Sequence, residues 1–176
     1  MESKKLSLQA RERLRRRYRP ANVRVLFVGE GPPASGRFFY QADSGLYRAV
    51  RDTFASVFPA EGEREFLEFF RSLGCYLVDL CGRPVDHLSG NQRLKACRDG
   101  EVRLAGILKR LRPEIVITVV RSISANVRRS QQRANWAGTH IELPYPGRWH
   151  HHRAAFLQEL SLVLHRIYKG NGACLL

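Results

Sequence analysis

The chain has 176 residues, of which 44% are hydrophobic, and these values suit one folded domain and exclude a disordered or fibrous protein. Lys and Arg total 30 against 16 Asp and Glu, which gives a formal net charge of +14. Such an excess favours a polyanionic partner, with nucleic acid first and an anionic membrane surface second.

The chain alternates between helical and strand patterns. Helical patterns cover residues 11–19 (a basic helix or arm, "RERLRRRYR"), a helix capped by Asp43 or Ser44, 63–74, 99–113 with Asp99 at its start, 122–136, and a closing helix from about 151. Short apolar runs predict strands at 23–29, 75–80, 114–120 and 139–145.

Strands that alternate with helices predict an α/β fold, because parallel strands need crossover connections. We expect a three-layer αβα arrangement with a central, mainly parallel four-stranded sheet. Residues 1–20 would form a basic N-terminal segment, 21–170 the domain and 171–176 a tail. Neither a signal-peptide pattern nor a bilayer-spanning apolar run occurs, so we expect a cytoplasmic protein, associated with the nucleoid if bacterial.

Ligands of such sheets bind beyond the carboxyl ends of the strands. Three loops leave those ends: "GEGPPASG" after the first strand, "CGRPVDH" after the second and "PGRWHHH" after the fourth. The first loop is rich in glycine and is followed by Phe38 and Phe39. It predicts either a ligand that approaches the backbone closely or a tight turn with two core phenylalanines.

The three loops, in this order, resemble the motifs of the uracil-DNA glycosylase superfamily, and "GEGPPASGRFF" is similar to the first motif of its thermophile-type class with a four-iron cluster. The resemblance covers the chain from about Val23 to Ile167. It implies a DNA glycosylase that flips a damaged base out of DNA and hydrolyses its N-glycosidic bond in base excision repair. The residues that the first motif implies as the base pocket are Gly29, Glu30, Gly31 and Pro32 as backbone, and Phe39 or Phe38 as the stacking ring.

"YLVDLCGRP" resembles the second motif, in which an Asn pairs with uracil, and Asp79 stands at that position. An ionised carboxylate only accepts hydrogen bonds and would repel a carbonyl oxygen of the base. Asp79 is therefore either a specificity residue for a base that offers donors, or a general base for the attacking water. A third alternative is a structural carboxylate that caps a helix or pairs with Arg83. Asp79 ranks first among the catalytic candidates, ahead of His150 and Glu30.

"LPYPGRWHHHRAAF" occupies the place of the motif that carries a catalytic His and a phosphate-binding Ser. Tyr145, Pro146 and Gly147 stand there instead, so the usual route of catalysis is altered. One of the histidines at 150–152 could compensate, or all could form a solvated helix start. Trp149 is the candidate for a side chain that wedges into the duplex.

Several further residues are expected to contact DNA phosphates, although solvated helix faces are the ordinary explanation of basic runs. The expected DNA-binding residues are Arg83, Gly147, Arg148, Trp149, His151, Arg153, Arg128 and Arg129.

Cys81 and Cys97 match the last two ligands of the cluster in the resembling class. Four thiolates are needed for such a cluster, and the segment before the first strand holds arginines where that class has its other pair. We therefore expect the cluster to be lost, with no cofactor and no metal. Cys75 and Cys174 do not fill the empty places.

The sequence thus predicts a monomeric, monofunctional DNA glycosylase with altered catalytic motifs, whose partner is DNA with a damaged, non-uracil base rather than a membrane. The rival hypothesis is a non-catalytic nucleic-acid-binding module with a glycosylase fold. A third is an α/β enzyme acting on a nucleoside or nucleotide, which explains the pocket but not the net charge.

Overall fold

A computed structural model of the chain describes residues 6–61, 65–147 and 149–170. It confirms the α/β class, with one four-stranded parallel sheet in the order β2-β1-β3-β4. The strands are β1 (Val25–Gly29), β2 (Cys75–Asp79), β3 (Ile115–Thr118) and β4 (Thr139–Glu142). The helices are α1 (Leu8–Arg17), α2 (Gly45–Val57), α3 (Phe66–Ser72), α4 (Gly90–Leu111), α5 (Ser124–Ala134) and α6 (His150–Tyr168), with short 3-10 turns η1 (Phe39–Gln41), η2 (Pro59–Glu61) and η3 (Arg121–Ile123).

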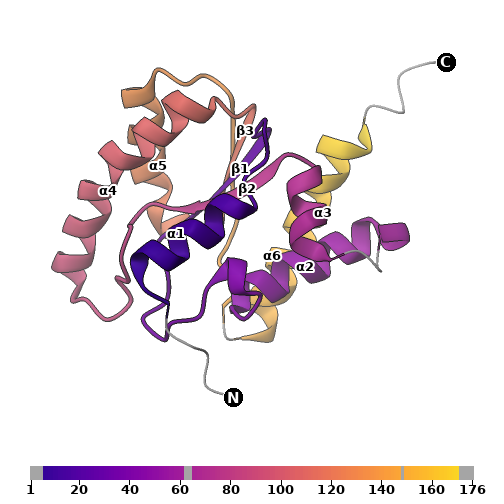
Figure 1. Cartoon of the computed structure of the whole chain (residues 1–176), viewed down its shortest axis with the longest axis horizontal. Helices are drawn as coiled ribbons and strands as arrows, with labels where there is room; N and C mark the ends of the chain where they lie inside the picture. The colour runs from indigo at the N-terminus through magenta and orange to yellow at the C-terminus, as the bar shows by residue number, and fades with distance from the viewer. Residues whose placement is uncertain (1–5, 62–64, 148, 171–176) are drawn as a thin grey trace.

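The helices cover both faces of the sheet, as Figure 1 shows. The chain passes from β1 to β2 through α2 and α3 on one face, where α6 also packs against α2. It passes from β2 to β3 and from β3 to β4 through α4 and α5, which pack together on the other face. The loops after β1 and β3 therefore leave neighbouring strands toward opposite faces, and such a point is where open parallel sheets leave a crevice for ligands.

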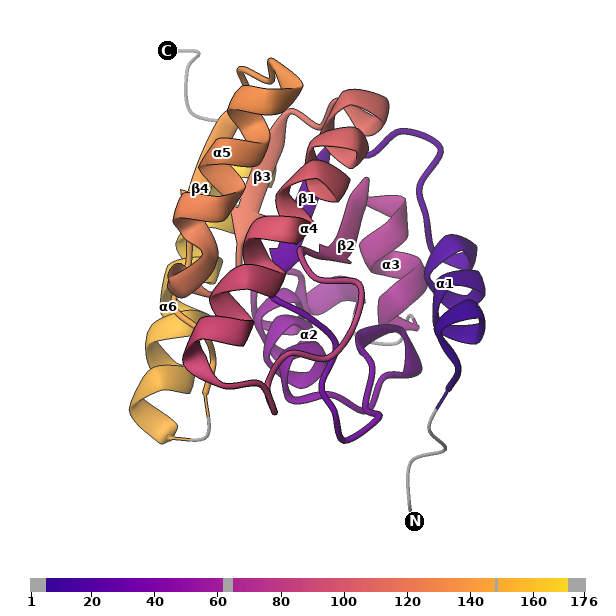
Figure 2. The same ribbon diagram turned by 90° about the vertical axis from the view of Figure 1, so that its left-hand side faces the viewer.

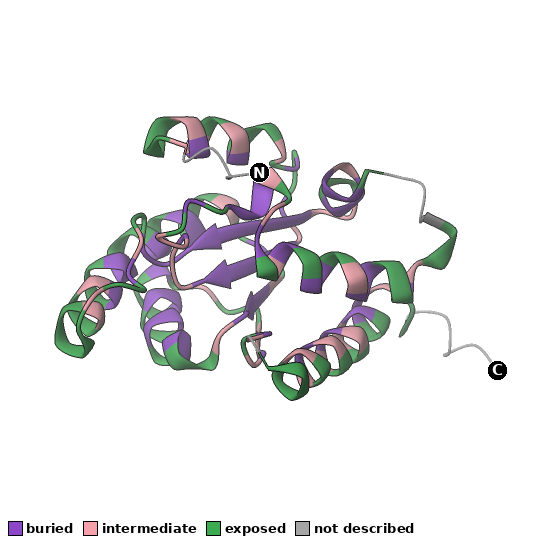
Figure 3. Ribbon diagram, turned by 90° about the horizontal axis from the view of Figure 1, so that it is seen from below, coloured by how far each residue is buried: buried purple, intermediate pink, exposed green. Residues whose placement is uncertain are grey.

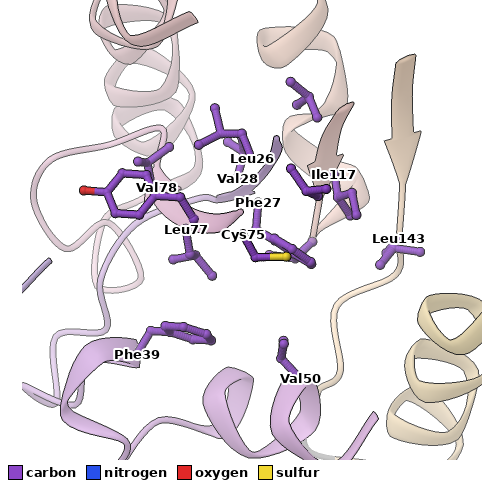
Figure 4. Packing of buried hydrophobic residues seen from close by; sticks show 14 of the residues in the cluster. Leu26, Phe27, Val28, Phe39, Val50, Cys75, Leu77, Val78, Ile117 and Leu143 are labelled. Atoms are coloured by element: carbon purple, nitrogen blue, oxygen red, sulfur yellow. The ribbon is translucent and has the colours of Figure 1, made fainter. Parts of the chain in front are cut away.

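Burial on both faces of the sheet explains why β1 and β2 are apolar runs. Every residue of β1 and β2 is buried, and Figure 3 shows buried strands in the middle of the molecule while the outer helix faces are exposed. The core between the sheet and α2 is aromatic, and Figure 4 shows Phe39 and Leu77 pointing toward one another across it. The core thus reaches the carboxyl ends of the strands, where Phe39 lies.

The basic N-terminal segment forms helix α1, which lies beside the edge strand β2 (Figure 2). Tyr18 stacks on Tyr40 of η1, with ring centroids 5.8 Å apart. Two arginines of α1 are buried against the domain: Arg11 is 5% exposed and Arg15 is 7% exposed. The segment is therefore part of the domain surface and not a separate arm in the described residues.

The long helix α4 begins earlier than the sequence predicted. Asp99 lies in its interior, where its carboxylate pairs with Lys95, 2.9 Å away. The helix begins after Ser89, whose backbone N–H donates to Gln92 in a capping box. In α2 the cap is Ser44, because the Asp43 carboxylate accepts the backbone N–H of Phe38 instead.

Two glycines of α4 differ sharply in their surroundings. A Cβ at Gly100 would lie 2.5 Å from the backbone oxygen of Leu80, whereas nothing lies within 4 Å of one at Gly106. We expect Gly100→Ala to lower the free energy of unfolding by about 1–3 kcal/mol, because α4 must move away from β2. Gly106→Ala should raise it by about 0.5–1 kcal/mol, since alanine favours the helix.

Urea unfolding of the two variants measures this difference. The close approach of α4 to β2 would be refuted if both substitutions stabilised the protein equally.

Within the described ranges, none of the helices is both long enough and apolar enough to cross a membrane.

Candidate functional site

A pocket of about 240 Å³ opens at the carboxyl ends of the strands. It lies at the crevice that the topology creates, and segments from all four strand ends contribute to its walls. Its lining residues are Gly29, Glu30, Gly31, Pro32, Pro33, Phe38, Phe39, Ser44, Gly45, Leu46, Leu77, Asp79, Val85, Asp86, Arg93, Val119, Val120 and Tyr145. All the residues predicted for the base pocket, together with Asp79, are thus brought to one place.

The backbone of the first loop forms one wall. Its register continues that of the sheet, since the N–H of Leu80 donates to the backbone oxygen of Gly29 at 2.8 Å. Gly29 lies opposite Asp79 in the parallel pairing, and a Cβ at Gly29 would be 2.8 Å from Oδ1 of Asp79. A side chain here would push against the carboxylate, so glycine is what lets Asp79 Oδ1 lie against this wall.

Two aromatic rings form an adjoining wall, and both are almost fully buried. The ring of Phe39 packs against Tyr40, Tyr47 and Phe70, with centroids 5.2–5.7 Å apart. The ring of Phe38 is faced by the guanidinium groups of Arg15 and Arg11, at 5.5 and 5.9 Å from its centroid. Phe39 is therefore fixed by the core, and Phe38 by cation–π contacts with α1.

Asp79 is the most deeply buried of the acidic residues in the pocket, with 8% of its side chain exposed. Its Oδ2 accepts a hydrogen bond from Nη2 of Arg15 at 3.1 Å, and its backbone oxygen accepts one from Arg103 at 2.5 Å. Arg15, and not Arg83, is thus its ion-pair partner. The sequence could not predict Arg15 as the partner, because nothing in the arginine-rich pattern of α1 indicates which residue faces inward.

Burial raises the pKa of the Asp79 carboxyl above its ordinary value. The positive charge of Arg15 opposes this effect most strongly, followed by the charges of Arg103 and Arg11. A carboxylate with increased proton affinity beside an apolar pocket is suited to accept a proton from a bound water.

Glu30 also lines the pocket, but its carboxylate is held by Arg93 of α4. Nε of Arg93 donates to Oε1 at 2.6 Å, and Nη2 donates to Oε2. This bidentate pair fixes the first loop to the start of α4. Sequence reasoning missed Arg93, because the predicted start of the helix at Asp99 left it in a loop; the Ser89–Gln92 capping box was the signal that could have placed it.

Asp86, from the second loop, was also missed. Both of its carboxylate oxygens accept the backbone N–H of Ala34 at 3.1 Å. This contact ties the first loop to the second, and the Glu30–Arg93 pair ties it to α4, so the pocket wall is held from two sides.

The third loop contributes Tyr145, whose side chain lines the pocket while the residue remains 51% exposed. Burial, with Asp86 and Glu30 adding to it, raises the pKa of Tyr145, so its hydroxyl is neutral near pH 7 and can donate. Gly147 lies close to the ring of His152, and a Cβ there would be 3.0 Å from Nδ1. Arg148 lies outside the described residues.

The residues that start α6 do not line the pocket. His150 and His151 are exposed, and the ring of His151 contacts that of His152 at a centroid distance of 4.2 Å. Trp149 is 65% exposed, and Arg153 donates to the carboxylate of Asp52 at 2.5 Å. His150 therefore has no contact with the pocket that would support its predicted catalytic role, which stays a prediction.

Three of the predicted DNA-binding arginines lie away from α6 and fall into two groups. Arg128 and Arg129 lie on α5 and pair with Glu142 and Glu101, so their charges are already balanced in part. Arg83 is exposed in the second loop, close to the pocket, and lines a neighbouring hollow with arginines of α1 and α4.

The cysteines do not build a four-thiolate site in the described residues. The sulfurs of Cys81 and Cys97 lie 3.8 Å apart. Cys75 is instead buried at the start of β2, where its sulfur lies 3.1 Å from the hydroxyl of Tyr168. The described residues contain no group of three or more His, Cys, Asp or Glu side chains placed to hold a metal ion. A four-iron cluster therefore does not fit them, and Cys174 lies outside the described residues.

No protein-family model matches the chain, and no curated protein is significantly similar to it in sequence. The function must therefore be inferred from the geometry of the pocket and the charges around it.

Proposed function

We propose that this chain is a monofunctional DNA glycosylase that flips a damaged base out of DNA and hydrolyses its N-glycosidic bond in base excision repair. The observation that carries the proposal is the pocket itself. A glycine backbone, two fixed phenylalanine rings and the buried carboxylate of Asp79 converge on a space of about 240 Å³ at the strand ends. A flipped base needs this combination of close backbone approach, a flat apolar surface and a polar group at its edge.

The chemistry of Asp79 favours a base other than uracil. The ionised carboxylate accepts hydrogen bonds only and repels carbonyl oxygens, so it suits N1–H of hypoxanthine, which has a carbonyl oxygen on one side only, better than N3–H of uracil, which lies between two. Tyr145 complements it, because a neutral hydroxyl donates to a carbonyl oxygen of the same base. The proposal gives Asp79 one of two roles. It either accepts a hydrogen bond from the edge of the base or holds the attacking water as a general base.

The reaction is a hydrolysis. The water oxygen forms a bond to C1′ of the sugar as the N-glycosidic bond breaks, the base leaves with the bonding electrons, and Asp79 takes the proton of the water. The departing base is protonated from solvent, and the DNA phosphates stabilise the positive charge on the sugar. No lysine occurs among the described residues that line the pocket, which favours water over an amine as the nucleophile.

One observation favours the rival function, a binding module that does not cut. Each acidic residue that lines the pocket is already engaged: Glu30 with Arg93, Asp79 with Arg15, and Asp86 with the N–H of Ala34. An ion-paired carboxylate is a weaker base than the same carboxylate without its partner, and a pocket built this way would recognise a base without hydrolysing its bond.

A panel of oligonucleotides separates the two functions. Each carries one uracil, hypoxanthine, xanthine or alkylated base, as single strand and as duplex, and abasic sites are scored by alkaline cleavage. Cleavage at a base other than uracil supports the proposed enzyme. Binding that depends on salt without any cleavage supports the module, and turnover of free nucleosides alone would support a small-molecule enzyme instead.

Trp149 gives a further prediction, because a large apolar side chain that is 65% exposed, four positions after the pocket residue Tyr145, is suited to fill the gap left by a flipped base. We expect Trp149→Ala to lower the rate of excision from duplex DNA by about tenfold, equivalent to about 1.4 kcal/mol, and from single strands much less. Leu162→Ala, equally exposed at 65% on α6, is the matched control and should change neither rate. Equal losses on both substrates would argue against a wedge.

A further inference from the structure

Helix α1 and helix α4 enclose two adjoining hollows beside the pocket, with volumes of about 310 and 650 Å³. They share Glu12, Arg15 and Arg103 as walls, so they form one continuous surface, which we call the arginine groove. The nearer hollow also touches Pro32 of the pocket's first loop. The arginine groove therefore begins where the base pocket ends.

The charge of the arginine groove is one-sided. The nearer hollow adds Arg11 and Arg83 to the shared arginines, and the farther one adds Arg16, Arg19 and Arg110. Glu12 is the sole acidic residue among the described residues that line it, and it already pairs with Arg15 and Arg16 at 2.7 and 3.4 Å. Most of the positive charge is left without a counterpart from the protein.

Arg11 shows this imbalance most clearly. The residue is 95% buried, yet its Nε has no hydrogen-bond partner, and no ion pair within the described part of the chain involves it. Arg19 and Arg110 likewise take part in no ion pair among the described residues. Arg11 faces the ring of Phe38 but has no ion-pair partner in the described residues. A guanidinium buried in this way is costly, and an anion held in the adjoining hollow would offset that cost.

We propose that the arginine groove binds the phosphodiester backbone of the DNA strand that carries the flipped base. Arg11 and Arg83 contact the phosphates next to the pocket, and Arg16, Arg19 and Arg110 contact those farther along the strand. We assign one strand to the groove, because the groove begins at Pro32, beside the pocket that takes the base of that strand. The inference rests on the proposed function for the identity of the ligand, but strand binding does not require that a base be excised.

Salt-dependent binding of an undamaged, fluorescein-labelled single strand tests the groove. For single strands the slope of log K against log salt changes by about 0.7 for each phosphate contact. Arg16→Gln and Arg110→Gln should each reduce the slope by that amount and weaken binding about fourfold at 0.15 M salt. Both arginines are exposed, so these changes should leave the fold intact.

The chain offers matched controls that remove the same charge from the same helices. Arg13 of α1 and Lys109 of α4 are exposed and do not line the groove, so Arg13→Gln and Lys109→Gln should leave the slope unchanged. Equal losses in the control and groove variants would overturn the proposal, because net charge alone would then explain binding. Arg11→Gln, checked for folding by circular dichroism, should act as the groove variants do.

Two other measurements keep this result apart from the proposed function. Vesicles with anionic lipid should bind the wild type and the groove variants alike; a loss on vesicles without a loss on DNA would overturn the DNA assignment. If the groove variants lose strand binding as expected and the wild type excises no base from any substrate, the groove stands and the glycosylase proposal fails.

Discussion

Asp79→Asn is expected to lower kcat/KM for excision of the preferred base by about 10²- to 10⁴-fold, the usual contribution of a general base. The amide cannot accept a proton from water, and its N–H₂ would face a base edge that offers donors. In the wild type, activity should increase as the pH rises through the pKa of Asp79, because the reaction requires the ionised form. Burial raises that pKa, so the acid limb should lie above the ordinary range for aspartate.

The measurement is a single-turnover excision rate on duplex and single-stranded substrate, as a function of pH. Asp99→Asn makes the same chemical change at an exposed site on α4, 65% of whose side chain is accessible, and should leave the rate unchanged. An Asp79→Asn variant with wild-type rates on every base would remove Asp79 from the site.

Arg15→Met is expected to have the largest effect on stability. It removes the ion-pair partner of a carboxylate that is 8% exposed, and the loss of one member of a buried pair costs about 3–5 kcal/mol near neutral pH. The loss of Arg15 raises the pKa of Asp79 further, because its charge is the strongest influence that lowers it. The folded variant then holds a proton that the unfolded chain releases, so its stability falls as the pH rises between the two pKa values.

Urea unfolding at several pH values checks both the size of the loss and its sign. The loss relative to the wild type should be smallest near the ordinary pKa of aspartate and should grow toward neutral pH. The double variant with Asp79→Asn should recover part of the stability, since no buried charge is then left unpaired. Arg13→Met, at an exposed position of the same helix, is the control. A loss that is independent of pH would show that Arg15 acts through packing alone.

The fold could be predicted from the sequence because local and global signals agree. The apolar runs of the four strands, and the helical patterns between them, require a parallel sheet with crossovers on both faces. The apolar runs extend beyond the strands. Val119 and Leu143 are buried although they lie after the last residues of β3 and β4. The start of α4 was predicted too late, since Asp99 resembles a cap and the capping box at Ser89 was overlooked.

The pocket was predictable where the backbone itself forms the wall. Gly29 ends β1 and Asp79 ends the neighbouring strand, so parallel pairing must bring them together, and Gly31 follows directly. The partners of the carboxylates could not be predicted. Arg15 and Arg93 reach these carboxylates from the distant helices α1 and α4, and the spacing of arginines in the sequence does not reveal which of them faces inward.

The place of the third loop shows a second limit. Tyr145 reaches the pocket, but His150 follows it by only five positions and is exposed at the first turn of α6. Sequence distance along an irregular loop does not determine side-chain direction, whereas the register of a strand does. The prediction of His150 depended on such a distance.

The most direct measurement is the release of free bases from genomic DNA that has been deaminated by nitrous acid, with uracil, hypoxanthine and xanthine quantified together by mass spectrometry. The account predicts that the wild type releases hypoxanthine or xanthine in preference to uracil, and that Asp79→Asn releases neither at a comparable rate. A wild-type protein that binds this DNA in a salt-sensitive manner but releases no base above the buffer control would contradict the glycosylase proposal and leave a nucleic-acid-binding module.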